Sequence, residues 1–89
     1  MNQETNVNTA KLKWACRRGM LELDVLLGNF LTEAYPRLPE AEQRLFVQLL
    51  ECTDPELFAW LMGREQPPSP ELAIITDIIR SHARSRLSA

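Results

Sequence analysis

Apolar residues recur along this chain at the three-to-four-residue spacing of amphipathic helices. The clearest stretch runs from about Leu21 to Ala34, where one apolar stripe faces a polar side. Its members are Leu23, Leu26, Leu27, Phe30, Leu31 and Ala34. No segment alternates apolar and polar residues for long enough to predict a strand. The pattern predicts an all-α fold, a compact bundle of about five short helices.

Capping and breaking residues set the expected limits of the first two helices. A short helix is predicted from about Ala10 to Arg17, with Thr9 as its N-cap. Gly19 then permits a tight turn into the second helix, because glycine adopts left-handed backbone angles at little cost. Tyr35-Pro36 should end the second helix, since the residue before a proline avoids the α region.

Similar signals predict three further helices. One starts near Pro39, with that proline at the first helical position. The next is predicted to have Asp54 as its cap and Pro55 at its first position, and to close at Gly63. Ser69 should cap the last helix. Its basic end, from Arg80 onward, is expected to fray.

The chain of 89 residues has room for one domain with one modest core. We expect a flexible N-terminus over residues 1–8, a single helical domain over 9–87 and a tail at 88–89. No apolar run approaches the ~20 residues that span a bilayer, and the start of the chain lacks a signal-peptide pattern. The net charge of −2 disfavours nucleic-acid binding. These features predict a cytoplasmic protein, and we expect a monomer.

Residues that could carry catalysis are sparse. Cys16 and Cys52 are flanked by apolar residues and are predicted to be unreactive thiols. The single histidine, His82, is predicted to be a surface or half-buried residue of the last helix. No metal-ligand spacing or phosphate-binding glycine loop is present. The sequence therefore predicts no metal site, no cofactor site and no enzyme activity.

The most unusual segment is RRGMLELD at positions 17–24, which places two cations, a glycine and two acids within eight residues. One interpretation is that cations at one helix end and acids at the next complement the helix dipoles. The other is that the turn displays a guanidinium and a carboxylate to a partner. Trp14 and Trp60 both lie off their apolar stripes. Each is predicted either to pack sideways, Trp14 under an arginine, or to be an exposed interface anchor.

This segment contains an RGxxE pattern, and LFVQLLECTDPELFAWLMG follows at residues 45–63. Together they resemble the succinate dehydrogenase FAD-assembly (flavinylation) factors, over roughly residues 10–82. The resemblance implies a five-helix bundle that binds the flavoprotein subunit of succinate dehydrogenase, and in bacteria also that of fumarate reductase. It implies that the chain promotes covalent attachment of FAD to a histidine of that subunit. FAD would then belong to the partner, with none stably bound here.

The resemblance also implies a partner-binding patch formed by Arg18, Gly19 and Glu22, with Arg17 and Asp24 as secondary members. We expect Arg18 to meet partner carboxylates or carbonyls, and Glu22 to meet a cation or backbone N–H groups. Other interpretations are an antitoxin-like or regulatory protein-binding module, a helix-turn-helix DNA-binding domain and an enzyme. The acidic balance disfavours the DNA-binding domain, and no residue set supports the enzyme.

Overall fold

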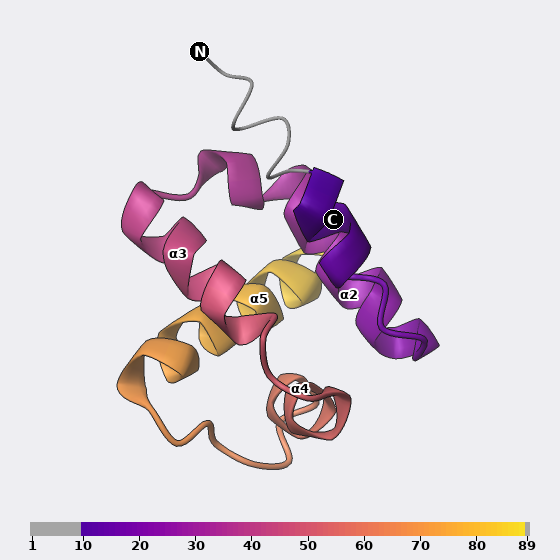
Figure 1. The fold of residues 1–89 in the computed structure, drawn as a ribbon, viewed down its shortest axis with the longest axis vertical. Coiled ribbons are helices and arrows are strands. Elements are labelled where there is room, and N and C mark those ends of the chain that lie inside the picture. The colour runs from indigo at the N-terminus through magenta and orange to yellow at the C-terminus, as the bar shows by residue number, and fades with distance from the viewer. Residues whose placement is uncertain (1–9, 89) are drawn as a thin grey trace.

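A computed structural model describes residues 10–88, with side chains described through residue 87 (Figure 1). Residues 10–15 are helical, and four longer helices follow: α2 (Leu21–Glu33), α3 (Glu40–Leu49), α4 (Asp54–Leu61) and α5 (Pro70–Ser88), with the 3₁₀ turn η1 (Tyr35–Arg37) between α2 and α3. Residues 10–88 contain no strand, so the predicted all-α class is confirmed. The predicted cap Thr9 and the predicted N-terminus over 1–8 lie outside the described residues.

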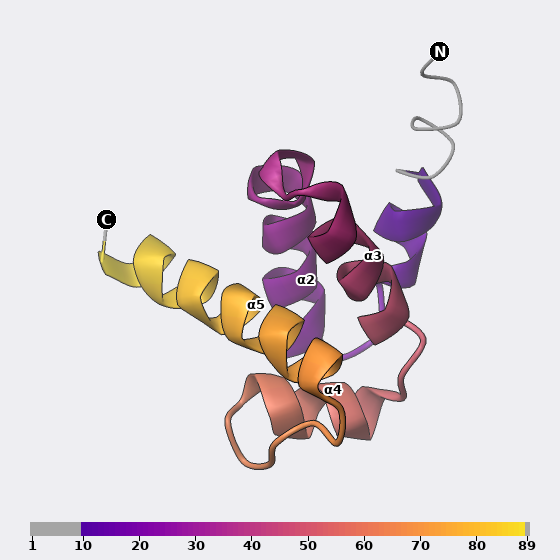
Figure 2. The same ribbon diagram turned by 90° about the vertical axis from the view of Figure 1, so that its left-hand side faces the viewer.

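Helix α5 is the element around which the others assemble. It packs against α2, α3 and α4, and Figure 2 shows it crossing α2 and passing over α4. Its C-terminal turns extend past α2. The molecule measures 40 × 30 × 26 Å with a radius of gyration of 12.5 Å, in agreement with the predicted compact bundle.

The core comes from the predicted apolar stripes. On α2 the buried members are Leu23, Leu27, Phe30 and Leu31. The Phe30 ring lies 5.2 Å from that of Phe46 on α3, and Ile75 and Ile79 of α5 are also fully enclosed. Burial of these side chains removes apolar surface from water, which is the main favourable term in folding.

The two tryptophans have opposite environments. Trp60 is only 5% exposed and belongs to the core, so its position off the predicted stripe did not make it a surface residue. Trp14 is 78% exposed, and no arginine of the described residues lies over its ring. Of the two predicted environments for Trp14, the structure has the exposed one.

The start of α4 differs from the prediction by one residue. Thr53, not Asp54, is the N-cap, and it forms a capping box with Glu56. The Glu56 backbone N–H donates to Thr53 Oγ1 at 3.4 Å, while the Thr53 N–H donates to Glu56 Oε1 at 3.0 Å. Two helix-end donors are satisfied in this way. The Asp54 carboxylate is consequently not needed as a cap.

The two ends of α5 differ in how they match the prediction. Ser69 caps α5 as predicted, with its Oγ accepting from the Leu72 N–H at 3.1 Å. The predicted fraying from Arg80 onward was wrong, because α5 continues to Ser88. Glu33 of α2 contacts this end of the helix, since its carboxylate bonds to His82 Nε2 at 3.1 Å and to Arg86 Nε at 2.8 Å.

Candidate functional site

The RGxxE segment forms the turn between the helical residues 10–15 and α2. Cys16 and Arg17 still donate backbone hydrogen bonds to Leu12 and Trp14, and the chain then reverses at Gly19. Gly19 has φ +91°, a conformation that disfavours residues with a Cβ. A Cβ added there would meet no atom within 4 Å. The glycine is therefore required by backbone conformation and not by crowding within this chain.

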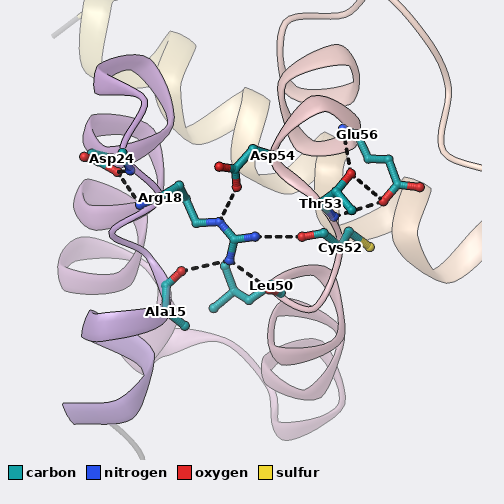
Figure 3. Close-up of polar contacts among 9 residues, drawn as sticks. Ala15, Arg18, Asp24, Leu50, Cys52, Thr53, Asp54 and Glu56 are labelled. Atoms are coloured by element: carbon teal, nitrogen blue, oxygen red, sulfur yellow. Dashed lines mark hydrogen bonds and ion pairs between the residues drawn. The ribbon is translucent and has the colours of Figure 1, made fainter.

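Asp24 holds the turn from the first turn of α2. Its Oδ1 accepts the backbone N–H of Arg18 at 2.6 Å and that of Gly19 at 3.3 Å (Figure 3). The N-cap residue of α2, Met20, has no side-chain capping bond. Asp24 thus fixes the backbone of the motif, and its bonded oxygen faces the chain's own turn.

The Arg18 side chain points into the molecule, toward the loop between α3 and α4 (Figure 3). Its Nε donates to Asp54 Oδ1 at 2.8 Å, and Nη2 donates to the Cys52 carbonyl at 2.7 Å. Nη1 donates to the carbonyls of Ala15 and Leu50, both at 3.0 Å. Only 16% of the side chain is exposed.

These contacts join three helix ends. Ala15 is the last helical residue of 10–15, Leu50 is the C-cap of α3 and Asp54 is the first residue of α4. A cation is favourable where helix C-terminal carbonyls converge. The dipole interpretation therefore describes Arg18. The expected contact of Arg18 with a partner stays a prediction, and the structure adds that its guanidinium is already bonded within the chain.

Glu22 has the opposite orientation. It is exposed, and its carboxylate has no hydrogen bond or ion pair within residues 10–88. Leu21 and Val25, neighbours on the same helix surface, are 75% and 50% exposed. Trp14, on the helical segment before the turn, is 78% exposed. We use the name turn face for the exposed residues on either side of the turn, which are Trp14, Leu21, Glu22 and Val25. It combines exposed apolar side chains with one uncompensated acid, a composition suited to contact with another protein.

The remaining secondary member, Arg17, is exposed and has no ion-pair partner among the described residues. The motif therefore has two outward charged groups, Arg17 and Glu22, and two inward ones, Arg18 and Asp24. Sequence reasoning missed Asp54 as the partner of Arg18. The one local signal was the capping-box pattern of Thr53 and Glu56, which leaves Asp54 without a capping role but does not identify its partner.

The two cysteines are at least partly buried, and the histidine is bonded to another side chain of the fold. Burial raises the pKa of Cys16 to about 11 and also raises that of the half-buried Cys52. His82 bonds to Glu33 and packs edge-on against Phe30, with ring centroids 5.5 Å apart. Residues 10–88 bring together no group of three His, Cys, Asp or Glu side chains that could hold a metal ion. Nor does any helix in this range have the length and apolar character to cross a membrane.

The fold and the site define a small helical bundle with a turn held by internal hydrogen bonds and with exposed apolar and acidic residues beside it. The chain belongs to the family described as "Flavinator of succinate dehydrogenase", which it matches over residues 10–83. The family membership that RRGMLELD and the later stretch suggested is thereby confirmed.

Curated relatives agree with this assignment. The chain is 53% identical over 77 residues to the FAD assembly factor SdhE of Shewanella oneidensis, covering 86% of this chain and 94% of the relative. It is 55% identical over 73 residues to the FAD assembly factor SdhE of Colwellia psychrerythraea, covering 82% and 80%. A solution structure of a UPF0350 protein superimposes with a TM-score of 0.73 at 49% identity, covering 89% of this chain and 84% of that one.

Proposed function

We propose that this chain binds the flavoprotein subunit of succinate dehydrogenase, and that of fumarate reductase, and promotes covalent attachment of FAD to a histidine of that subunit. It acts as a cytoplasmic monomer. The family and the relatives named as FAD assembly factors support the assembly role. The observation that carries the site assignment is the unpaired Glu22 carboxylate, exposed beside Leu21 and Val25 on a turn held by Arg18 and Asp24.

The contribution of the chain is positional. The reacting atoms belong to the flavin and to the partner's histidine, and their reaction depends on near-attack geometry. A factor that binds the competent conformation of the partner more tightly raises the population of that conformation. Glu22 would pair with a cation or with backbone N–H groups of the flavoprotein. Arg18 and Asp24 act indirectly, because they fix the turn that carries Glu22.

The chain itself supplies neither a nucleophile nor a flavin site in this proposal. A thiol with a pKa of about 11, as at Cys16, is almost fully protonated at neutral pH and a weak nucleophile. FAD is bound by the partner. Titration of the isolated chain with FAD should leave flavin fluorescence unchanged, whereas saturable quenching would show a flavin site on the chain.

The test is reconstitution of apo-flavoprotein with FAD, with and without this chain. Covalent flavin is scored by fluorescence of the denatured flavoprotein band. We expect the wild-type chain to accelerate loading and Glu22→Gln, which removes the charge but keeps the shape, to lose most of that acceleration. The matched control is Glu51→Gln, at an exposed acid of the α3–α4 loop.

The possible outcomes of this reconstitution test the proposed function and the proposed site separately. No acceleration by the wild-type chain contradicts the proposed function. Acceleration that survives Glu22→Gln refutes the turn-face assignment alone. Affinity capture from lysate addresses the antitoxin-like alternative: recovery of a large flavoprotein supports assembly, and recovery of a small membrane or cytoskeletal protein in its place supports the alternative.

A further inference from the structure

A groove of about 350 Å³ lies between the N-terminal helical segment and α2. The N-terminal segment and the turn contribute Lys13, Cys16 and Arg17. The α2 side consists of Asp24, Gly28, Leu31 and Thr32. These α2 residues recur at three-to-four-residue spacing, so they form one edge along the helix.

No contact within residues 10–88 requires glycine at position 28. It lies in the middle of α2, where glycine is less favourable than almost any other residue. A Cβ placed there would meet no atom within 4 Å, apart from the helix's own neighbouring backbone. The fold would therefore accept a side chain at this position. What the glycine provides is an open groove in which another backbone can approach α2 closely.

The charges of the groove are unbalanced. Lys13 and Arg17 are exposed cations with no ion-pair partner in the described part of the chain. The single acid, Asp24, already accepts two backbone N–H groups of the turn. Two free cations beside an apolar floor of Cys16 and Leu31 favour an occupant that carries carboxylates.

The groove also continues the outward surface of α2. Leu21, Val25 and Gly28 follow one another at four- and three-residue spacing and share a helix face. We propose that this groove receives an acidic segment of the flavoprotein, whose backbone passes over Gly28 and whose carboxylates pair with Lys13 and Arg17. This inference rests on the proposed function and adds a second contact beside Glu22.

The first test is Gly28→Leu, measured for thermal stability and for affinity toward apo-flavoprotein. Because leucine favours helix and the site is open, we expect an unchanged or higher Tm. Blocking the groove should weaken binding by about tenfold or more. Gln48→Leu, at an exposed position of α3, is the matched control and should bind like the wild type. Wild-type affinity of a folded Gly28→Leu chain would overturn the proposal.

A second variant addresses charge and remains informative if Gly28→Leu fails to fold. Lys13→Glu should weaken binding by about tenfold at low salt and less at high salt, because screening reduces the repulsion. Arg37→Glu, at an exposed cation outside the groove, should have little effect. Equal affinities for these two variants would contradict the assigned occupant.

The occupant can be identified with a benzoylphenylalanine photo-cross-linker at Thr32, an exposed residue of the groove. We expect cross-links to an acidic stretch of the flavoprotein. The proposed acidic occupant would be refuted by cross-links confined to neutral or basic stretches, or by a complex that forms without any cross-link. A wild-type chain that accelerates FAD loading while all groove variants bind normally disproves the groove and leaves the proposed function intact.

Discussion

Arg18 and Glu22 belong to one short motif but have different physical roles. The guanidinium donates to three carbonyls and one carboxylate inside the protein, whereas the Glu22 carboxylate has no partner within residues 10–88. Substitution of either residue would be expected to reduce the acceleration of FAD loading, so an activity assay alone does not distinguish their roles. Stability separates them, because only Arg18 is bonded within the fold.

Arg18→Ala should destabilise the fold by about 2–3 kcal/mol, because it leaves partly buried carbonyls and Asp54 without their donor. For a chain of this size that lowers the Tm by roughly 10–20 °C. Arg18→Lys should have a Tm between those of the wild type and Arg18→Ala. Lysine keeps the charge but lacks the guanidinium fork that reaches several acceptors. Arg17→Ala should stay within about 0.5 kcal/mol of the wild type. Equal melting curves for Arg17→Ala and Arg18→Ala would contradict the internal role.

The Cys16 thiol gives a second prediction at this scale. Burial raises its pKa from 9.0 to about 11, so the folded protein binds the thiol proton more tightly than the unfolded chain does. The associated stabilisation is complete below pH 9 and is lost as the pH rises toward 11. The alkylation rate of native Cys16 should be half-maximal near pH 11, and that of Cys16 in the urea-unfolded chain should be half-maximal near pH 9. A native rate that is half-maximal near pH 9, with helicity intact by circular dichroism, would refute this environment.

The C-terminal turns of α5 receive a polar contact from another element. Its apolar residues Ile75 and Ile79 lie in the core, but the turns from residue 80 onward contain few buried side chains. Glu33 of α2 compensates by binding His82 and Arg86 on successive turns. These ion pairs are at least partly exposed, so their effect should be local.

Glu33→Gln should increase amide hydrogen exchange over residues 82–88 without changing exchange over 72–79. Acid should act in the same way. Arg86 first, and then His82, lower the pKa of Glu33, so its stabilising contribution is present above pH 4.5 and is lost as the pH falls further. Unchanged protection of residues 82–88 in the variant would show that the end of α5 is not stabilised by the Glu33 ion pairs.

The helices themselves were predictable from sequence because they depend on local rules. Apolar spacing identified the buried face of α2, and Ser69 and Gly19 marked a cap and a turn. The Arg18 contacts with Leu50, Cys52 and Asp54 were not predictable, because they join residues 32 to 36 positions apart. The burial of Trp60 likewise depends on the elements that surround α4. Tertiary packing decided both cases.

In the whole molecule, one face should meet the flavoprotein while the core stays unchanged. The two tryptophans provide matched reporters, since Trp14 is 78% exposed on the turn face and Trp60 is 5% exposed in the core. Fluorine at position 5 of each indole gives a signal whose H₂O-to-D₂O isotope shift reports contact with solvent. Trp14 should show this shift in the free chain and Trp60 should not.

The decisive measurement is that isotope shift after addition of unlabelled apo-flavoprotein, with line broadening of both signals as proof of complex formation. Docking through the turn face predicts that Trp14 loses its isotope shift and that Trp60 is unaffected. A complex in which Trp14 keeps its full shift would contradict the assignment, because the partner would then be bound elsewhere on the molecule.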